Sequence, residues 1–193
     1  MSAAAAAGPL RALQGSRSSL FERDLLYLFS FDADLEMRRD EIGFVPGGLR
    51  VNITSKPNRT RVYHAARESS TLGFQTVEGT VVSGVDRALI RNDDIGVLDV
   101  QLTIRTDDGA LIYSEYRGIY PAGERGYRRL ISRKPLLGTE FSPFKAPVYI
   151  TPRYQTDSEK YRWLTQYQCV GFGEVQVIKS DIRSVTFDIY ALD

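Results

Sequence analysis

Residues 97–119 read VLDVQLTIRTDDGALIYSEYRGI, and the pairing within this stretch organises the rest of the chain. Two runs of alternating apolar and polar residues flank Asp107-Asp108-Gly109, which is the sequence pattern of a β-hairpin. Two loop lengths fit the pattern. A two-residue loop would set Ile104 opposite Tyr113. A three-residue loop, in which the glycine adopts the left-handed conformation, sets the same isoleucine opposite Ile112.

The three-residue loop gives the better cross-strand pairs. It keeps one face of the hairpin apolar and sets unlike charges opposite one another, as stable register requires. Its other pairs are Val100 with Tyr116, Leu102 with Ser114, Asp99 with Arg117, Gln101 with Glu115 and Thr103 with Tyr113. We therefore predict the three-residue loop.

The second face of the hairpin is polar. It carries Asp99, Gln101, Thr103, Arg105 and Tyr113. The alternation by itself favours a polar face in contact with solvent, because antiparallel sheets usually have one solvated side. The alternative is that this face lines a ligand cavity inside a barrel.

Composition excludes several classes of function. The 193 residues indicate one domain, and 42% of them are hydrophobic, enough for a core. Lys and Arg total 25 while Asp and Glu total 24, which argues against a nucleic-acid-binding protein. One cysteine, Cys169, cannot form an intrachain disulfide, and one histidine, His64, cannot build a multi-histidine metal site. We expect no metal and no cofactor, since phosphate-binding glycine loops and nucleophile elbows are also absent from the sequence.

The start of the chain differs in composition from the rest. Residues 1–19 are rich in Ala, Gly and Ser, and we expect a disordered or loosely docked lead. They lack the basic and leucine-rich regions of a secretory signal, and no apolar run has the roughly 20 residues of a membrane helix. We expect a cytoplasmic protein without a membrane partner, and a single β-barrel domain over residues 20–193.

The remaining pattern is that of an all-β protein with one short helix. Strands are predicted over residues 25–35, 49–54, 74–82, 85–91, 148–154, 164–172 and 184–192, besides the hairpin. Residues 56–72 form a long polar connection that holds His64. Helical spacing predicts a helix over residues 123–137 and a helical turn over 157–163. About eight to ten short strands favour a closed antiparallel β-barrel.

Three runs carry a resemblance to a known family. They are VEGTVVSGVDRALI, LDVQLTIRTDDGALIYSEYRG and YITPRYQTDSEKYRWLTQYQCVGFG, in that order. The sequence resembles the domain-of-unknown-function family thirty-two thirty-seven, which comprises small β-barrel proteins. The matching positions are Gly84, Asp86, Leu98, Asp99, Thr103, residues 105–113, Pro152, Arg153, Thr156, Tyr161, Trp163 and Leu164. The sequence departs from the family at Arg87 for Trp, Gln101 for Arg, Thr165 for Asn, and in residues 56–72.

The resemblance implies a fold and a class of function. Barrels that resemble this chain occur in fungal biosynthetic pathways, where some guide dehydration and cycloaddition of tropolone-like intermediates, including hetero-Diels–Alder closure. The resemblance also reverses the preference for the polar hairpin face, because Asp99, Thr103 and Arg105 recur in the family motif beyond what a turn requires. It therefore favours a cavity lined by that face.

We accordingly predict a cofactor-independent enzyme of secondary metabolism that binds an apolar conjugated small molecule in the barrel. The predicted catalytic residues are Asp99, Arg105, Tyr113 and Arg153. The predicted substrate-binding residues are His64, Asp86, Gln101, Thr103, Tyr149 and Trp163. The two arginines would polarise a carbonyl, an Asp or Tyr would assist loss of water, and Trp163 and Tyr149 would stack on a conjugated ring.

Two other functions fit the same sequence. One is a non-catalytic barrel that carries or shields a small apolar ligand. The other is a structural module whose exposed aromatics or barrel edge form a homodimer. A ligand that co-purifies without turnover would favour the first, and a fully packed barrel interior would favour the second.

Overall fold

The computed structural model describes residues 25–34, 37–55, 60–63, 77–124, 144–178 and 181–192. Ten strands lie in these ranges: β1 (Leu25–Asp34), β2 (Met37–Val45), β3 (Gly48–Ser55), β4 (Thr60–Tyr63), β5 (Gly79–Arg91), β6 (Ile95–Thr106), β7 (Leu111–Pro121), β8 (Phe144–Gln155), β9 (Cys169–Ile178) and β10 (Asp181–Leu192). One 3-10 helix, η3 (Arg162–Gln166), lies between β8 and β9.

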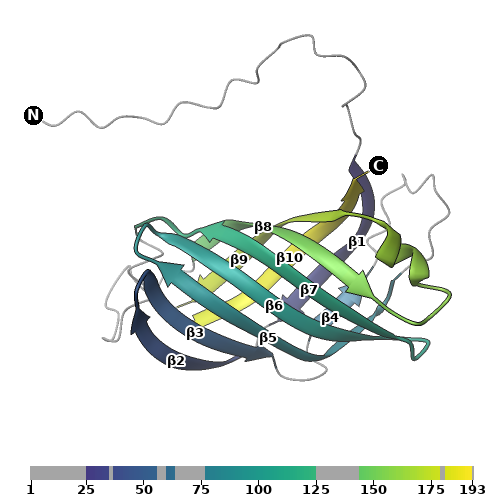
Figure 1. Cartoon of the computed structure of the whole chain (residues 1–193), viewed down its shortest axis with the longest axis horizontal. Helices are drawn as coiled ribbons and strands as arrows, with labels where there is room; N and C mark the ends of the chain where they lie inside the picture. The colour runs from purple at the N-terminus through teal and green to yellow at the C-terminus, as the bar shows by residue number, and fades with distance from the viewer. Residues whose placement is uncertain are drawn as a thin grey trace, which may run out of the picture.

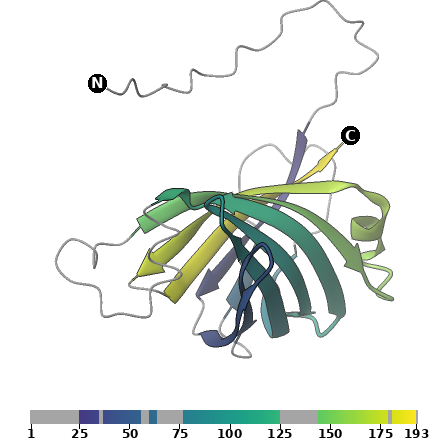
Figure 2. The same cartoon turned by 60° about the vertical axis from the view of Figure 1, so that its left-hand side comes forward.

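Eight of the strands close into an antiparallel β-barrel (Figure 1). The order is β5-β4-β1-β10-β9-β8-β7-β6, and pairing of β6 with β5 completes the ring. Strands β3 and β2 extend the sheet from the second half of β5. Figure 2 shows the strands curving around a common axis. The closed antiparallel barrel predicted from the sequence is therefore confirmed.

The central hairpin has the predicted register. Ile104 pairs with Ile112 and Val100 with Tyr116 across β6 and β7. The loop has three residues, because the Gly109 N–H donates to the Thr106 carbonyl at 2.9 Å and Thr106 N–H donates to the Ala110 carbonyl at 2.9 Å. Gly109 has a φ of +93°, the left-handed conformation that glycine adopts without steric strain.

Alternation along β6 separates an inner and an outer face. Leu98, Val100, Leu102 and Ile104 are buried inside the barrel, while the residues between them are partly or fully exposed. The apolar side chains fill the interior because their removal from water drives folding. The polar face of the hairpin consequently lies on the outside of the barrel.

Several predicted elements differ from the structure. The two strands predicted over 74–82 and 85–91 form one strand, β5, from Gly79 onward, and β2 and β4 are strands that the pattern did not predict. The helical turn predicted over 157–163 lies slightly later in the chain, as a turn followed by η3, which includes Leu164, so the following strand begins at Cys169. The helix predicted over 123–137 lies outside the described residues after Glu124, and so do residues 1–19. Within the described ranges, no helix is long and apolar enough to cross a membrane.

Candidate functional site

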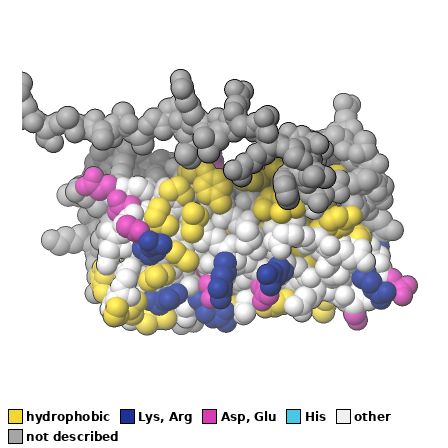
Figure 3. Space-filling model, turned by 45° about the horizontal axis from the view of Figure 1, so that its top comes forward, with side chains coloured by type: hydrophobic (Ala, Val, Ile, Leu, Met, Phe, Trp, Pro, Cys, Tyr) yellow, Lys and Arg dark blue, Asp and Glu magenta, His cyan; other side chains and the backbone are white. Residues whose placement is uncertain are grey.

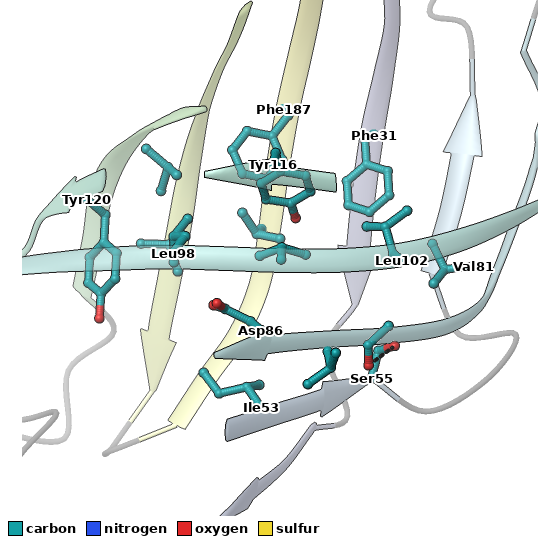
Figure 4. Close-up of a pocket in the computed structure, with 16 residues that line it drawn as sticks. Phe31, Ile53, Ser55, Val81, Asp86, Leu98, Leu102, Tyr116, Tyr120 and Phe187 are labelled. Carbon is teal, nitrogen blue, oxygen red and sulfur yellow. Dashed lines mark hydrogen bonds between the residues drawn. The ribbon is translucent and has the colours of Figure 1, made fainter. Parts of the chain in front are cut away.

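The barrel encloses a cavity of about 80 Å³ (Figure 4). Its walls are mainly apolar and include Phe31, Val100, Leu102, Tyr116, Tyr120 and Phe187. These side chains come from β1, β6, β7 and β10, so strands far apart in sequence build one chamber. A cavity inside a closed barrel is a common place for a small ligand.

Asp86 is the one carboxylic acid among the described residues that line this cavity. It projects from β5, opposite Val100 in the register. The other polar side chains of the wall are Ser55, Tyr116 and Tyr120. The Ser55 hydroxyl donates to the Gly84 carbonyl at 3.4 Å, so one of these groups is already engaged with the backbone.

An irregularity in β5 directs Asp86 inward. Val81 pairs with Ile104 and Ser83 pairs with Thr103, so Val82 is an extra residue at a β-bulge. A bulge of one residue exchanges the faces of the strand after it. Without the bulge, strict alternation from the buried Val81 would direct Asp86 outward.

Burial raises the pKa of Asp86 to about 7. The residue is partly exposed, yet the surrounding protein removes most of the water around the carboxyl and disfavours the charged form. The Asp99 backbone N–H donates to Asp86 Oδ1 at 3.0 Å and stabilises the carboxylate, as does the charge of Arg50. The charge of Asp99 acts in the opposite direction. A carboxyl with this pKa exists in both protonation states near neutral pH.

Two tyrosine hydroxyls of the cavity wall remain protonated. Burial raises the pKa of Tyr116 and of Tyr120 well above the usual value, and the nearby charge of Asp86 raises both further. Tyr120 reaches the interior because Gly96 lies beneath its ring, where a Cβ would come within 1.8 Å of Tyr120 Cε1. Both phenols can donate hydrogen bonds to a ligand oxygen.

The structure separates Asp86 from the other predicted site residues. Asp99, Gln101, Thr103, Arg105 and Tyr113 belong to the outer face of the hairpin and do not line the cavity. The expectation, favoured by the resemblance, that this face lines the cavity is wrong, because the apolar side chains of the same strands occupy the interior. This outer face is connected to the cavity by the hydrogen bond that the Asp99 backbone N–H donates to Asp86.

The remaining predicted residues also lie away from the cavity. Arg153 is exposed on β8, where it pairs with Glu115, and Tyr149 is 46% exposed and packs edge-to-face on Phe172 outside the barrel. Trp163 is partly buried on η3, against the hydrophobic core. His64 lies outside the described residues.

Sequence reasoning missed Ser55, Tyr116 and Tyr120 as site residues. Tyr116 carried a usable signal, because the predicted register already set it opposite Val100 on the apolar face. Tyr120 has the same parity on β7 and is 1% exposed. Ser55 carried no comparable signal, since it is the last residue of β3 and lies just beyond the strand predicted over residues 49–54.

The acidic loop of the hairpin has a structural role. Asp108 accepts hydrogen bonds from Lys160 and Thr106, and from the Tyr161 hydroxyl at 3.0 Å, which ties the loop to the segment before η3. The hydrogen bonds from Lys160 and Thr106 hold the pKa of Asp108 well below its usual range. Asp107 binds Arg61 of β4 through two hydrogen bonds of 2.9 and 2.6 Å. These contacts explain why turn, β4 and η3 meet at one end of the barrel.

Two departures from the resembled family meet on the outer surface. Arg87 Nη2 donates to Gln101 Oε1 at 3.2 Å, so the residues that stand for Trp and Arg contact one another. Neither side chain lines the cavity.

On the face seen in Figure 3, Lys and Arg lie interspersed with Asp and Glu, and no single-sign patch dominates it.

Comparison with known proteins gives a family model and solved structures of similar fold. The model described as "Protein of unknown function (DUF3237)" matches residues 29–192. A curated relative, UPF0311 protein RPA1785 of Rhodopseudomonas palustris, is 32% identical over 88 residues, 46% of this chain. The chain spans about half of that relative's length, 54%, in this match.

Solved structures extend the likeness to most of the barrel. The crystal structure of the Rhodopseudomonas palustris protein has a TM-score of 0.65 at 22% identity and covers 89% of this chain and 99% of its own. A protein of unknown function from Clostridium acetobutylicum has a TM-score of 0.64 at 21% identity, with 89% and 100% covered. A structure described as an enzyme from Penicillium herquei has a TM-score of 0.54 at 18% identity, with 93% and 99% covered. At these identities the likeness shows a common fold.

Proposed function

Because the chain belongs to the DUF3237 family of proteins of unknown function, and because its barrel holds a buried carboxyl, we propose that it is a cofactor-independent enzyme. Its substrate is an apolar, conjugated small molecule that bears a hydroxyl or carbonyl group. Asp86 moves a proton on that molecule and so drives loss of water, after which the confined product cyclises. The observation that carries the proposal is that one carboxyl, with a pKa of about 7, lies among the described residues of a mainly apolar cavity wall.

The two protonation states of Asp86 suit the two halves of a dehydration. The acid form donates its proton to the substrate hydroxyl, the C–O bond breaks, and the bonding electrons leave with water. The carboxylate then accepts the proton that the conjugated cation loses, which restores the acid form and gives a neutral unsaturated product. A general acid or base works best when its pKa lies near the operating pH.

The cavity walls supply the remaining contributions. The hydroxyls of Tyr116 and Tyr120 can donate hydrogen bonds to a carbonyl oxygen on which negative charge develops. Apolar walls hold reacting atoms close together, which favours ring closure, including hetero-Diels–Alder closure, without a further chemical group. A description of the Penicillium herquei relative as an enzyme supports a catalytic role for this fold.

The size of the cavity limits how the substrate binds. At about 80 Å³ it is smaller than the cavity of about 150 Å³ that accommodates benzene in an engineered protein. We therefore propose that the reacting end of the substrate enters the cavity and the rest remains outside.

The proposal is tested with ortho-hydroxybenzyl alcohols, which give conjugated products on losing water. We expect the wild-type protein to accelerate their dehydration and Asp86→Asn to reduce that rate by roughly 10²- to 10⁴-fold. The asparagine keeps the size of the side chain and can still accept from the Asp99 N–H. Glu115→Gln, a carboxyl-to-amide change on the outer side of β7, is the matched control and should leave the rate unchanged.

A second function, a non-catalytic binding barrel, is favoured by the apolar character of the same walls. It predicts that these compounds bind equally to the wild type and to Asp86→Asn and that neither protein converts them. That result would remove the enzyme proposal and leave ligand carriage.

A further inference from the structure

The cavity carboxyl lacks a basic partner within the cavity. Among the described residues that line the wall, none is Lys, Arg or His. The hydrogen bond that Asp86 accepts comes from a neutral backbone N–H, that of Asp99. Arg50 acts on Asp86 from outside the cavity wall, and desolvation still outweighs it. A ligand that brings a positive charge into the cavity would therefore stabilise the carboxylate.

Aromatic rings stand close to the same space. Tyr116 and Phe187 pack edge-to-face with ring centroids 6.1 Å apart, and Phe31 and Phe187 lie 6.2 Å apart. Figure 4 shows these three rings grouped along one side of the cavity, with Asp86 projecting from β5 toward the same space. The faces of aromatic rings attract cations, and they do so more strongly where water is excluded.

We infer that the cavity binds a small protonated amine with apolar substituents, whose ammonium group lies between the Asp86 carboxylate and the aromatic rings. The apolar substituents fill the rest of the cavity, whose volume of about 80 Å³ admits only a few carbon atoms. The inference rests on the proposed function in one respect, that this cavity is the ligand site. It makes such amines inhibitors of the proposed reaction, because they hold Asp86 in its charged form.

The pH dependence of amine binding follows from the groups that act on Asp86. These are Asp99 on β6, Arg50 on β3, and Tyr116 and Tyr120 on β7. The other strands that face the cavity contribute apolar side chains there. Ammonium binding requires the carboxylate, so affinity should rise with pH through a pKa of about 7 and then level off until the amine itself loses its proton.

The probe is isopropylamine, and isopropanol is its neutral counterpart of similar shape. Binding is followed by NMR through the methyl signals of Val100 and Leu102, both of which line the cavity. We expect the wild-type affinity for isopropylamine to increase roughly tenfold between pH 6 and pH 8, as the carboxylate fraction of a group with a pKa of about 7 does. At pH 8 we expect Asp86→Asn to lose roughly tenfold or more in affinity for the amine. Isopropanol binding should be equal in both proteins, which also shows that the variant keeps its cavity, and Glu115→Gln should behave as the wild type.

The results separate the inference from the proposed function. Equal affinity of Asp86→Asn and wild type for isopropylamine, or an affinity that does not change between pH 6 and pH 8, overturns the inference. Asp86-dependent dehydration without amine binding leaves the proposed function and removes the inference. Asp86-dependent amine binding without any dehydration supports the inference and removes the proposal that the protein is an enzyme.

Discussion

Asp86 shows how one residue can couple the site to the stability of the whole chain. Its pKa rises from 3.8 to about 7 on folding, chiefly because burial removes water from the carboxyl. At any pH between these two pKa values, the folded protein binds more protons than the unfolded protein, so the free energy of unfolding falls as pH rises. The stability present below pH 4 is lost by about pH 7, and roughly three pKa units correspond to up to about 4 kcal/mol.

This linkage predicts the behaviour of Asp86→Asn, which carries no charge at any pH. Relative to the wild type, the variant should gain up to about 4 kcal/mol in unfolding free energy between pH 4 and pH 8. Urea unfolding at a series of pH values measures the difference. Glu115→Gln should show no comparable trend, and a difference between wild type and Asp86→Asn that stays constant with pH would contradict a raised pKa.

The residues of the site were only partly predictable. Asp86 is among the predicted substrate-binding residues, and the structure places it on the cavity wall. Alternation alone gives it the wrong face, because nothing in the residues around Val82 marks the bulge. The polar face of the hairpin was preferred because Asp99, Thr103 and Arg105 recur in the motif of the resembled family, yet in a barrel of this size the apolar face has to fill the interior.

At the scale of elements, the hairpin was the most predictable part. Its loop length and all its quoted pairs followed from the requirement that one face be apolar and opposite charges be paired. The strands with weak local patterns were missed. β4 has only four residues, β2 contains a bulge between Glu41 and Gly43, and Gly79 and Gly84 made β5 look like two strands. The short β4 depends on pairing with β1 and β5, and such tertiary pairing leaves little signal in the local sequence.

The loop of the hairpin gives an element-scale prediction. A Cβ at Gly109 would contact nothing within 4 Å, so Gly109→Ala changes only the backbone energy of a residue with φ of +93°. We expect it to reduce the free energy of unfolding by roughly 1–2 kcal/mol. Gly109→Asn is the matched variant and should lose less, since Asn tolerates left-handed conformations. Thermal unfolding of the three proteins measures the effect, and equal melting of alanine and asparagine variants would show that φ is not the cause.

At the scale of the whole molecule, β4 makes the fewest cross-strand pairs in the ring among the described residues. Within them, it pairs with β5 through two residue pairs and with β1 through four, whereas β6 and β7 share eleven. We therefore expect local opening to begin where β4 meets β5, and this contact is called the seam. Two features support it: Val62 is fully buried, and Arg61 reaches across β5 to Asp107 in the hairpin loop.

The two hydrogen bonds from the Arg61 guanidinium to the Asp107 carboxylate, called the fork here, should therefore control how often the barrel opens. Asp107→Asn removes the charge that holds the guanidinium, while Glu78, with Oε2 3.8 Å from Arg61 Nη2, remains as a weaker partner. Both side chains of the fork are about half exposed, so we expect the amides of β4 to exchange with solvent only roughly a few-fold faster, and those of β6 and β7 to be unchanged. High salt should have the same effect on the wild type, because it screens exposed ion pairs. Asp93→Asn, which removes the Arg91–Asp93 pair away from the seam, is the control. If Asp107→Asn speeds exchange throughout the barrel, the fork stabilises the fold as a whole, and the seam is not its weak point.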